Sequence, residues 1–243
     1  MLGSPDTPSS ATASDTDPVL DNPAWAALNG PHARFAERHG RAVRYQPDVC
    51  PMVALLDNPT PHDWADAATL VGPGGSLFLP VVTAAAPPGW GVRMQMPGVQ
   101  MVHMSANTHP DADVCELTPS DVPEMLDLVK RTDPGPFRQR TIELGTYLGI
   151  RHDGRLIAMA GERLHVPGYT EISAVCTDPA FQGHGFASRL IRAVAQGIRR
   201  RGEVPFLHAA ATNTHAIALY EHLGFSLRRE VMFQVFTAPG VGS

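Results

Sequence analysis

Lysine is almost absent from this chain of 243 residues, since Lys130 is the single lysine among 19 basic residues. Charged residues make up only 18% of the sequence, and the formal net charge is −5. No positive field over the whole molecule would attract nucleic acid or an anionic membrane surface. The three arginines at 199–201 lie near the end of an expected helix, where the helix dipole favours cations. We therefore expect neither nucleic acid nor a membrane as a partner.

Cysteine is also scarce. Cys50, Cys115 and Cys176 are odd in number and far apart, which argues for reduced thiols rather than a disulfide framework. No stretch has the pattern of a signal peptide, and no apolar run is long enough to span a bilayer. The histidines lack the spacing of metal ligands, so we expect no metal. These absences predict a cytoplasmic protein.

The chain divides into three expected parts. Residues 1–20 are rich in Ser, Thr, Asp and Pro, which is typical of a disordered tail. Residues 21–108 are expected to form a smaller α/β unit, with 32–38 helical and a further helix starting at Thr60-Pro61-His62-Asp63. Its order of elements is compatible with a degenerate copy of the second unit, although no sequence repeat supports this. A polar linker near 105–113 leads to the second unit, 109–243, in which 226–236 is predicted to be a hairpin that closes the sheet.

The second unit contains a strand, a glycine-bearing turn and a helix in direct succession. Residues 171–177 are apolar and β-branched, which indicates a buried strand. After Gln182-Gly183-His184-Gly185, apolar residues recur at helical spacing on one face, namely Ala187, Leu190, Ile191, Val194, Ala195 and Ile198. The unpaired N–H groups and the dipole of a helix start favour an anion, and glycines let it approach the backbone. The pattern predicts a site for a pyrophosphate.

Two other phosphate-binding loops do not fit. A dinucleotide-binding loop has three glycines in a fixed pattern and an acidic residue about 20 positions later. Here the third glycine is absent, and Arg199-Arg200-Arg201 follows instead. A nucleoside-triphosphate loop would need Gly-Lys-Ser/Thr, and Lys130 lies elsewhere.

The remaining pattern resembles the GNAT superfamily of acyl-CoA-dependent N-acyltransferases. The family signature, Gln/Arg-x-x-Gly-x-Gly/Ala, is matched by Gln182, Gly185 and Ala187. A second motif follows a further expected strand: Asn213, then a short helix with Leu219-Tyr220, then Leu223-Gly224-Phe225. The two motifs stand in the family's order, and the resemblance covers roughly 117–236. It implies a mixed α/β sheet with helices on both faces, and acetyl-CoA as co-substrate.

The resemblance also implies a role for individual residues. The backbone of Val175, Cys176 and Thr177 would bind the pantetheine arm and polarise the thioester carbonyl, and Asn213 would reach the pantetheine side. Tyr220 would protonate the departing sulfur. The pyrophosphate would lie on the turn and helix start formed by Gln182, Gly183, His184, Gly185, Phe186, Ala187 and Ser188.

Several of these assignments have alternatives. Tyr220 could be a core residue and Asn213 a helix cap, while Cys176 is expected to be inert packing. For the amine, Glu171 at the start of the central strand is the expected general base, with Glu162 and Glu143 as rivals.

The sequence therefore predicts a cytoplasmic N-acetyltransferase that transfers an acetyl group from acetyl-CoA to a primary amine by direct attack. A second hypothesis is a non-catalytic acyl-CoA sensor. The acceptor, a small molecule or a peptide, and the oligomeric state, a homodimer included, stay open.

Overall fold

The computed structural model describes residues 17–81, 83–104 and 113–240. The helices are α1 (Pro23–Leu28), α2 (Pro61–Val71), α3 (Val122–Thr132), α4 (Phe186–Arg200) and α5 (Thr214–His222). The strands are β1 (Ala36–His39), β2 (Ala42–Tyr45), β3 (Val53–Ala54), β4 (Ser76–Leu79), β5 (Gly91–His103), β6 (Cys115–Glu116), β7 (Tyr147–His152), β8 (Arg155–Val166), β9 (Tyr169–Thr177), β10 (Val204–Ala210) and β11 (Phe225–Thr237). Short 3-10 helices are Pro18–Leu20, Ala33–Phe35, Pro119–Asp121, Thr141–Leu144 and Pro179–Phe181.

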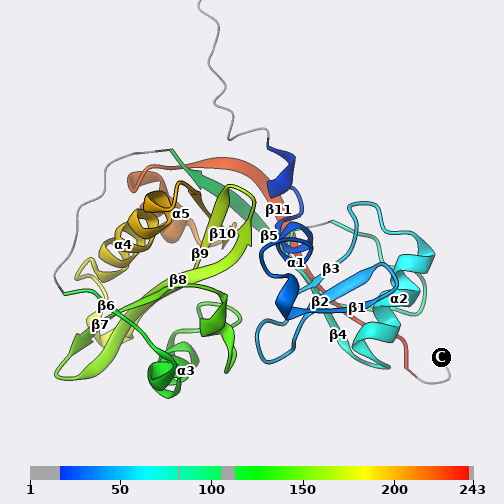
Figure 1. Cartoon of the computed structure of the whole chain (residues 1–243), viewed down its shortest axis with the longest axis horizontal. Coiled ribbons are helices and arrows are strands. Elements are labelled where there is room, and N and C mark those ends of the chain that lie inside the picture. Colours follow the sequence, from blue (N-terminus) through cyan, green and yellow to red (C-terminus); the bar gives the residue numbers. More distant parts are fainter. Residues whose placement is uncertain (1–16, 82, 105–112, 241–243) are drawn as a thin grey trace, which may run out of the picture.

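Eight strands form one mixed sheet in the order β4-β11-β5-β10-β9-β8-β7-β6. The β9–β10 pair is parallel, and the other neighbouring pairs are antiparallel. Helix α4 packs on one face of β8 and β9, and α3 packs on the other (Figure 1). The expected α/β fold with helices on both faces is confirmed.

Helix α4 shows how the sequence directs this packing. Its buried residues are Leu190, Ile191, Val194, Ala195 and Ile198. All five belong to the face predicted from helical spacing, while Arg192 and Arg200 are exposed. Burial of each large apolar side chain contributes roughly 1.5–3 kcal/mol. This face therefore fixes the start of α4 beside the end of β9.

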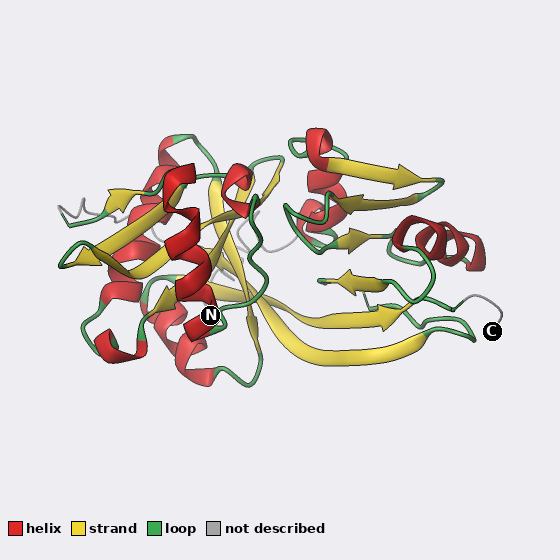
Figure 2. Ribbon diagram, turned by 90° about the horizontal axis from the view of Figure 1, so that it is seen from below, coloured by secondary structure: helices red, strands yellow, loops and turns green. Residues whose placement is uncertain are grey.

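Strands β5 and β11 are the longest in the fold and run from one half of the molecule into the other (Figure 2). They pair from Phe225 opposite His103 to Thr237 opposite Gly91. The predicted hairpin at 226–236 is wrong, because this stretch contains no Gly, Pro, Asn or Asp to make a turn and stays extended beside β5. The sheet thus contains strands from both sides of the expected linker, and the division into domains stays a prediction.

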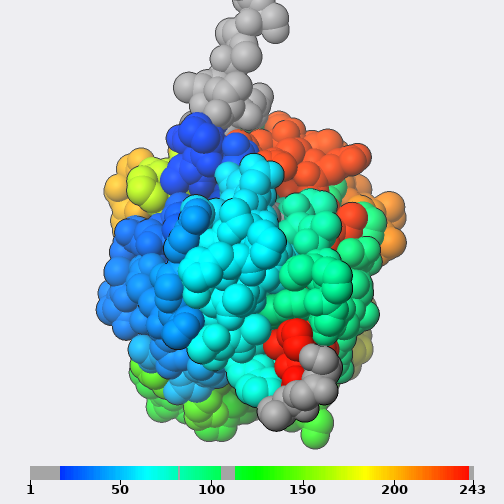
Figure 3. Space-filling model, turned by 90° about the vertical axis from the view of Figure 1, so that its right-hand side faces the viewer, coloured from blue at the N-terminus to red at the C-terminus, as the bar shows by residue number. Residues whose placement is uncertain are grey.

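The N-terminal part adds a small antiparallel sheet, β1-β2-β3, and helix α2. Helix α2 starts as predicted, since Thr60 and Asp63 each bind the other's backbone N–H. The prediction of a helix at 32–38 is confirmed only for a short 3-10 helix, Ala33–Phe35, and is wrong beyond it, because β1 begins at Ala36 and pairs with β2 around the turn at Gly40. Figure 3 shows this end of the molecule, where the blue and cyan N-terminal segments lie against the green residues of β5.

The start of the described chain is ordered. Pro18–Leu20 form a 3-10 helix, and the Leu20 side chain is fully buried. The backbone oxygen of Asp17 accepts a hydrogen bond of 2.8 Å from Nη2 of Arg228. Part of the stretch expected to be a tail, from Asp17 to Leu20, is therefore packed on the fold. The rest of that stretch, and residues 105–112 of the expected linker, lie outside the described residues.

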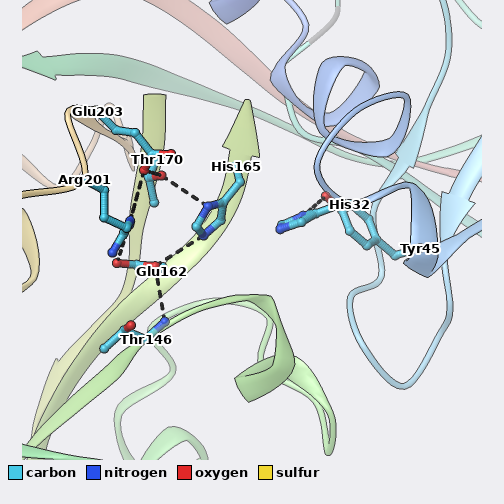
Figure 4. Close-up of polar contacts among 8 residues, drawn as sticks. All are labelled: His32, Tyr45, Thr146, Glu162, His165, Thr170, Arg201 and Glu203. Carbon is cyan, nitrogen blue, oxygen red and sulfur yellow. Dashed lines mark hydrogen bonds and ion pairs between the residues drawn. The ribbon is translucent and has the colours of Figure 1, made fainter. Parts of the chain in front are cut away.

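His32 and His165 meet where the N-terminal segments pack against β8 (Figure 4). Their ring centroids are 5.2 Å apart, and Nδ1 of His32 lies 2.9 Å from the hydroxyl oxygen of Tyr45. On the far side of His165, Glu162 accepts a hydrogen bond of 2.9 Å from Nη2 of Arg201, the residue that follows α4. Polar groups of the N-terminal segments and of β8 therefore meet where these two parts of the molecule pack together.

Candidate active site

The turn before α4 forms an open cradle at the helix N-terminus. Gly183 and Gly185 have φ angles of 82° and 74°, in the left-handed region that favours glycine. A Cβ atom at either position would meet no atom within 4 Å, so the space above the turn is free. A cavity of about 500 Å³ is lined by Gln182, Gly183, Gly185, Phe186, Ala187 and Ser188. The unpaired N–H groups of a helix start suit an anionic group in such a cavity.

His184 is the one residue of the expected pyrophosphate site, Gln182 to Ser188, that does not line the cavity. Its ring folds back onto the turn, where Nδ1 lies 3.1 Å from the carbonyl oxygen of Phe181 and 3.0 Å from that of Gln182. The ring is stacked with that of Phe186 at 5.7 Å. His184 therefore supports the shape of the turn from outside.

Strands β9 and β10 separate beside this cradle. Their parallel pairing runs from Tyr169 opposite Val204 to Glu171 opposite Phe206, and no further pair joins the described residues of these strands. On its other edge β9 stays paired with β8 as far as Thr177. An irregularity in that pairing contains Ala174, whose φ of 52° is unusual for a residue with a Cβ. Past Glu171, the β10-facing edge of β9 is therefore free to bind a ligand through its backbone.

A second cavity, of about 670 Å³, lies on the other side of this opening. It extends between β9 and β10 towards β4, β5 and β11. Five residues line both cavities: Asp133, Pro134, Val175, Asn213 and Tyr220. The two cavities therefore meet at three residues expected to take part in acyl transfer, Val175, Asn213 and Tyr220.

Tyr220 lies on α5 at this junction. Its side chain packs against the ring of Phe225, with centroids 6.1 Å apart. Burial raises the pKa of its hydroxyl above the usual value of 10.0. The hydroxyl therefore keeps its proton at neutral pH and has one to donate.

Asn213 acts as the N-cap of α5, since its Oδ1 accepts a hydrogen bond of 3.1 Å from the N–H of Ala216. It also lines both cavities. Because capping uses the carbonyl oxygen, the amide N–H₂ group remains as a donor at the junction. Asn213 can therefore serve both as the helix cap and as a contact for the pantetheine arm.

Val175, Cys176 and Thr177 line the first cavity from β9. The Cys176 side chain is only 7% exposed and packs among α3 and the sheet. Burial raises the pKa of its thiol to about 11. A thiol that stays protonated at neutral pH is a poor nucleophile, so Cys176 serves packing.

Glu171 is fully buried and lines neither cavity. Its two oxygens accept hydrogen bonds from Nε and Nη2 of Arg163, at 2.8 and 2.6 Å. Its Oε1 also lies 2.7 Å from Nδ1 of His208. Burial alone would raise the pKa of this carboxyl, but the charge and hydrogen bonds of Arg163, together with His208, outweigh burial and lower the pKa to about 2. A carboxylate held in this way is a weak base.

The two rival glutamates also lie away from both cavities. Glu162 is 2% exposed and is held by Arg201 and the N–H of Thr146. Glu143 is exposed and forms two hydrogen bonds with Arg140, at 2.7 and 2.8 Å. Neither residue is placed to accept a proton at the junction in this arrangement.

Among the described residues that line either cavity, Asp133 is the one that is acidic, and no site role was expected for it from the sequence. It follows α3, is exposed, and has a left-handed φ of 45°. No hydrogen bond or ion pair links its carboxylate to the described residues. The short Asp133-Pro134-Gly135-Pro136 loop was a signal of a turn, but only the fold brings it to the junction.

The sequence and the structure of this chain are similar to those of known proteins. A family model described as FR47-like protein matches residues 147–234. The N-alpha-acetyltransferase RimI of Mycobacterium tuberculosis is 33% identical over 133 residues, which cover 50% of this chain and 82% of that protein. A crystal structure described as an acetyltransferase from the GNAT family, from Novosphingobium aromaticivorans, matches with a TM-score of 0.83 and 39% identity. That match covers 90% of this chain and 98% of the other.

The chain belongs to the GNAT acetyltransferase family. A further relative, the [ribosomal protein bS18]-alanine N-acetyltransferase of Salmonella typhimurium, is 29% identical over 116 residues, 45% of this chain and 78% of that protein. The GNAT fold and the relatives show that this chain is an N-acetyltransferase that transfers acetyl to an amine.

Two further features of this GNAT enzyme concern metals and membranes. Within the described ranges, no three His, Cys, Asp or Glu side chains gather in a way that could hold a metal ion. None of the helices in the described part of the chain combines the length and the apolar character needed to cross a bilayer.

Proposed function

We propose that this GNAT enzyme uses acetyl-CoA as its acetyl donor and transfers the acetyl group directly to a primary amine. The observation that carries the proposal is the meeting of the two cavities at Val175, Asn213 and Tyr220. One cavity ends on the cradle at the start of α4, which suits a pyrophosphate, and the other has room for an acceptor.

The donor side fits acetyl-CoA through this chain's own groups. The turn and the first residues of α4 would hold the pyrophosphate through backbone N–H groups. The free edge of β9 at Val175, Cys176 and Thr177 would bind the pantetheine arm, and the amide of Asn213 would reach it from α5. Bound in this way, acetyl-CoA would supply the thioester that acylates the amine.

On the acceptor side, the amine must lose a proton and the departing sulfur must gain one. Tyr220 would give the sulfur its proton, and its raised pKa keeps that proton in place. For the amine, Glu171 as base would have to leave its ion pair with Arg163 or act through water. Asp133 offers a carboxylate at the junction itself. We propose Asp133 as the group that binds the ammonium and receives its proton, with Glu171 as a positioning residue for Arg163 and His208.

The acceptor is either a small amine or the N-terminus of a peptide. A peptide is supported by the relatives, one of which is named for an alanine of ribosomal protein bS18. The N-terminal part would shape the acceptor site, since Pro51, Met52, Ser76 and Phe78 line the second cavity. A cytoplasmic location is supported by the three free cysteines.

The test measures thiol release from acetyl-CoA over a panel of amines and peptides, with the acetylated product identified by mass spectrometry. The proposal expects amine-dependent release with one acetylated product per thiol. Tight acetyl-CoA binding without turnover over the whole panel would instead support the sensor hypothesis.

A further inference from the structure

One wall of the second cavity is apolar, and its residues come from distant parts of the chain. Strand pairing sets Met52 beside Phe78, Phe78 opposite Val235, and Val235 opposite Met94. On the same two long strands, Phe233 is opposite Met96. Directly opposite residues in a sheet project to the same face, so these side chains are neighbours. All six line the cavity: Met52, Phe78, Met94, Met96, Phe233 and Val235. We call this set the apolar wall.

The alternation along β5 shows which way the apolar wall faces. Met94 and Met96 are half-buried and line the cavity, whereas Arg93 and Gln95 between and beside them are exposed. Successive side chains on a strand point to opposite faces, so the methionines face inwards and Gln95 faces solvent. Gly98 on β5 has no side chain, and an added Cβ would collide with the ring of Phe233. Gly98 therefore lets Phe233 lie across the strand and continue the wall.

The apolar wall is continuous with the junction where acetyl transfer would occur. Phe233 packs edge-on against His208, with ring centroids 6.2 Å apart. His208 lies on β10, and Ala209 and Ala210 after it also line the cavity, which then reaches Asn213 and Tyr220. A molecule that fills this cavity therefore has one end at Tyr220 and Asp133 and the other on the apolar wall.

The polar groups deeper in the cavity carry little free charge. Arg163 lines the cavity, but its charge is balanced by the buried Glu171. Neither nitrogen of the His208 ring is free, since Nδ1 is 2.7 Å from Glu171 and Nε2 is 3.0 Å from Nε2 of Gln100. These contacts favour an uncharged group in that part of the cavity over a second ammonium or a carboxylate.

We propose that the acceptor is a primary amine that carries a bulky apolar group next to the reacting nitrogen, with that group seated on the apolar wall. The inference rests on the proposed function and names the substrate class of the same site. Three of the six wall residues are methionines, whose flexible side chains adapt to different shapes. The site therefore accepts several large apolar groups and selects against a small one.

The experiment compares glycinamide, leucinamide and phenylalaninamide as acceptors, with thiol release from acetyl-CoA as the readout. These amides share the α-amine and differ in the apolar group. The expected kcat/KM is at least about tenfold higher for leucinamide and phenylalaninamide than for glycinamide, because apolar contacts in a pocket discriminate by this order. Equal kcat/KM values for the three amides would overturn the inference.

Met96→Gln tests the wall itself, because it keeps the side-chain length and makes the inner face polar. We expect it to lower kcat/KM for phenylalaninamide about tenfold and to leave glycinamide within about twofold. Gln95→Met is the matched control, since it changes the outward face of the same strand and is expected to alter neither value. An unchanged preference in Met96→Gln would overturn the inference, while acetylation of the amides would still support the proposed function. No thiol release with any amine would reject the proposed function and this inference together.

Discussion

Arg163 on β8 holds Glu171 on β9 through two hydrogen bonds, Nε to Oε2 at 2.8 Å and Nη2 to Oε1 at 2.6 Å. The side chain of Glu171 is 0% exposed and that of Arg163 is 11% exposed. Arg163 lines the second cavity, and Glu171 is the last residue of β9 that pairs with β10 before the two strands separate.

Glu171→Gln removes the charge that compensates Arg163. Breaking one partner of a buried ion pair costs about 3–5 kcal/mol, because the other charge stays buried and unpaired. We expect a loss of this order in the free energy of unfolding, measured by denaturant titration at pH 7. Wild-type stability in this variant would contradict the role assigned to the pair.

The same pair gives a pH dependence. The pKa of Glu171 is lowered from 4.5 to about 2 in the folded state. Its contribution to stability is therefore complete above pH 4.5 and is lost as the pH falls from 4.5 towards 2. Unfolding measured across this range is expected to show a steeper loss of stability for wild type than for Glu171→Gln. Parallel curves would mean that the ion pair does not titrate as described.

Asp133→Asn tests which carboxylate serves the amine. If Asp133 binds the ammonium and receives its proton, the variant lowers kcat/KM for the amine roughly 10²-fold, the lower end of acid–base effects. The affinity for acetyl-CoA should not change. Asp153→Asn is the matched control, because Asp153 is also an exposed aspartate with a positive φ, 50° against 45°, but lies in the β7–β8 turn. Full activity of Asp133→Asn would return the role of base to Glu171.

Tyr220→Phe removes the proposed acid and keeps the ring that packs on Phe225. We expect turnover to fall roughly 10²–10⁴-fold while acetyl-CoA still binds. Burial raises the pKa of Tyr220 above 10.0. The activity of the wild type is therefore expected to show no fall from deprotonation of Tyr220 up to that pH. A variant as active as wild type over the whole pH range would refute the acid role.

The burial of His32 is expected to make the protein less stable in mild acid. Burial, together with the neighbouring His165 and Arg34, lowers the pKa of His32 from 6.5 to about 3. The folded state thus keeps His32 neutral, and its contribution is complete above pH 6.5 and lost as the pH falls towards 3. Between pH 7.5 and 5.5 this amounts to up to about 1.4 kcal/mol. Thermal unfolding of wild type and His32→Gln at both pH values checks this, and the variant should show a smaller difference.

The features predicted correctly from the sequence are local ones. The cradle follows from the glycines at 183 and 185 and from the helical spacing after them, and the start of α2 follows from Thr60 and Asp63. Both depend on residues within a few positions of each other, so pattern and propensity suffice.

The remaining features depend on pairing between distant segments. The apolar wall requires β5 to lie beside β11, more than 120 residues later, and the Arg163–Glu171 pair requires an irregular register between β8 and β9. No spacing in the sequence encodes either register. The hairpin expected at 226–236 was wrong for the same reason, since its partner strand lies in the N-terminal half.

The central claim is that acetyl-CoA binds with its pyrophosphate on the start of α4. Ser188→Glu tests this sharply, because Ser188 lines the cavity in the first turn of α4. An acidic residue there favours the helix and opposes a bound anion. Gly197→Glu adds the same charge near the other end of the helix, where an added Cβ meets no atom within 4 Å.

The most direct measurement is a calorimetric titration of acetyl-CoA into wild type and these two variants. The account predicts saturable binding to wild type and Gly197→Glu, and its loss in a fully folded Ser188→Glu. Equal affinity in all three proteins, or no binding to folded wild type, would contradict it.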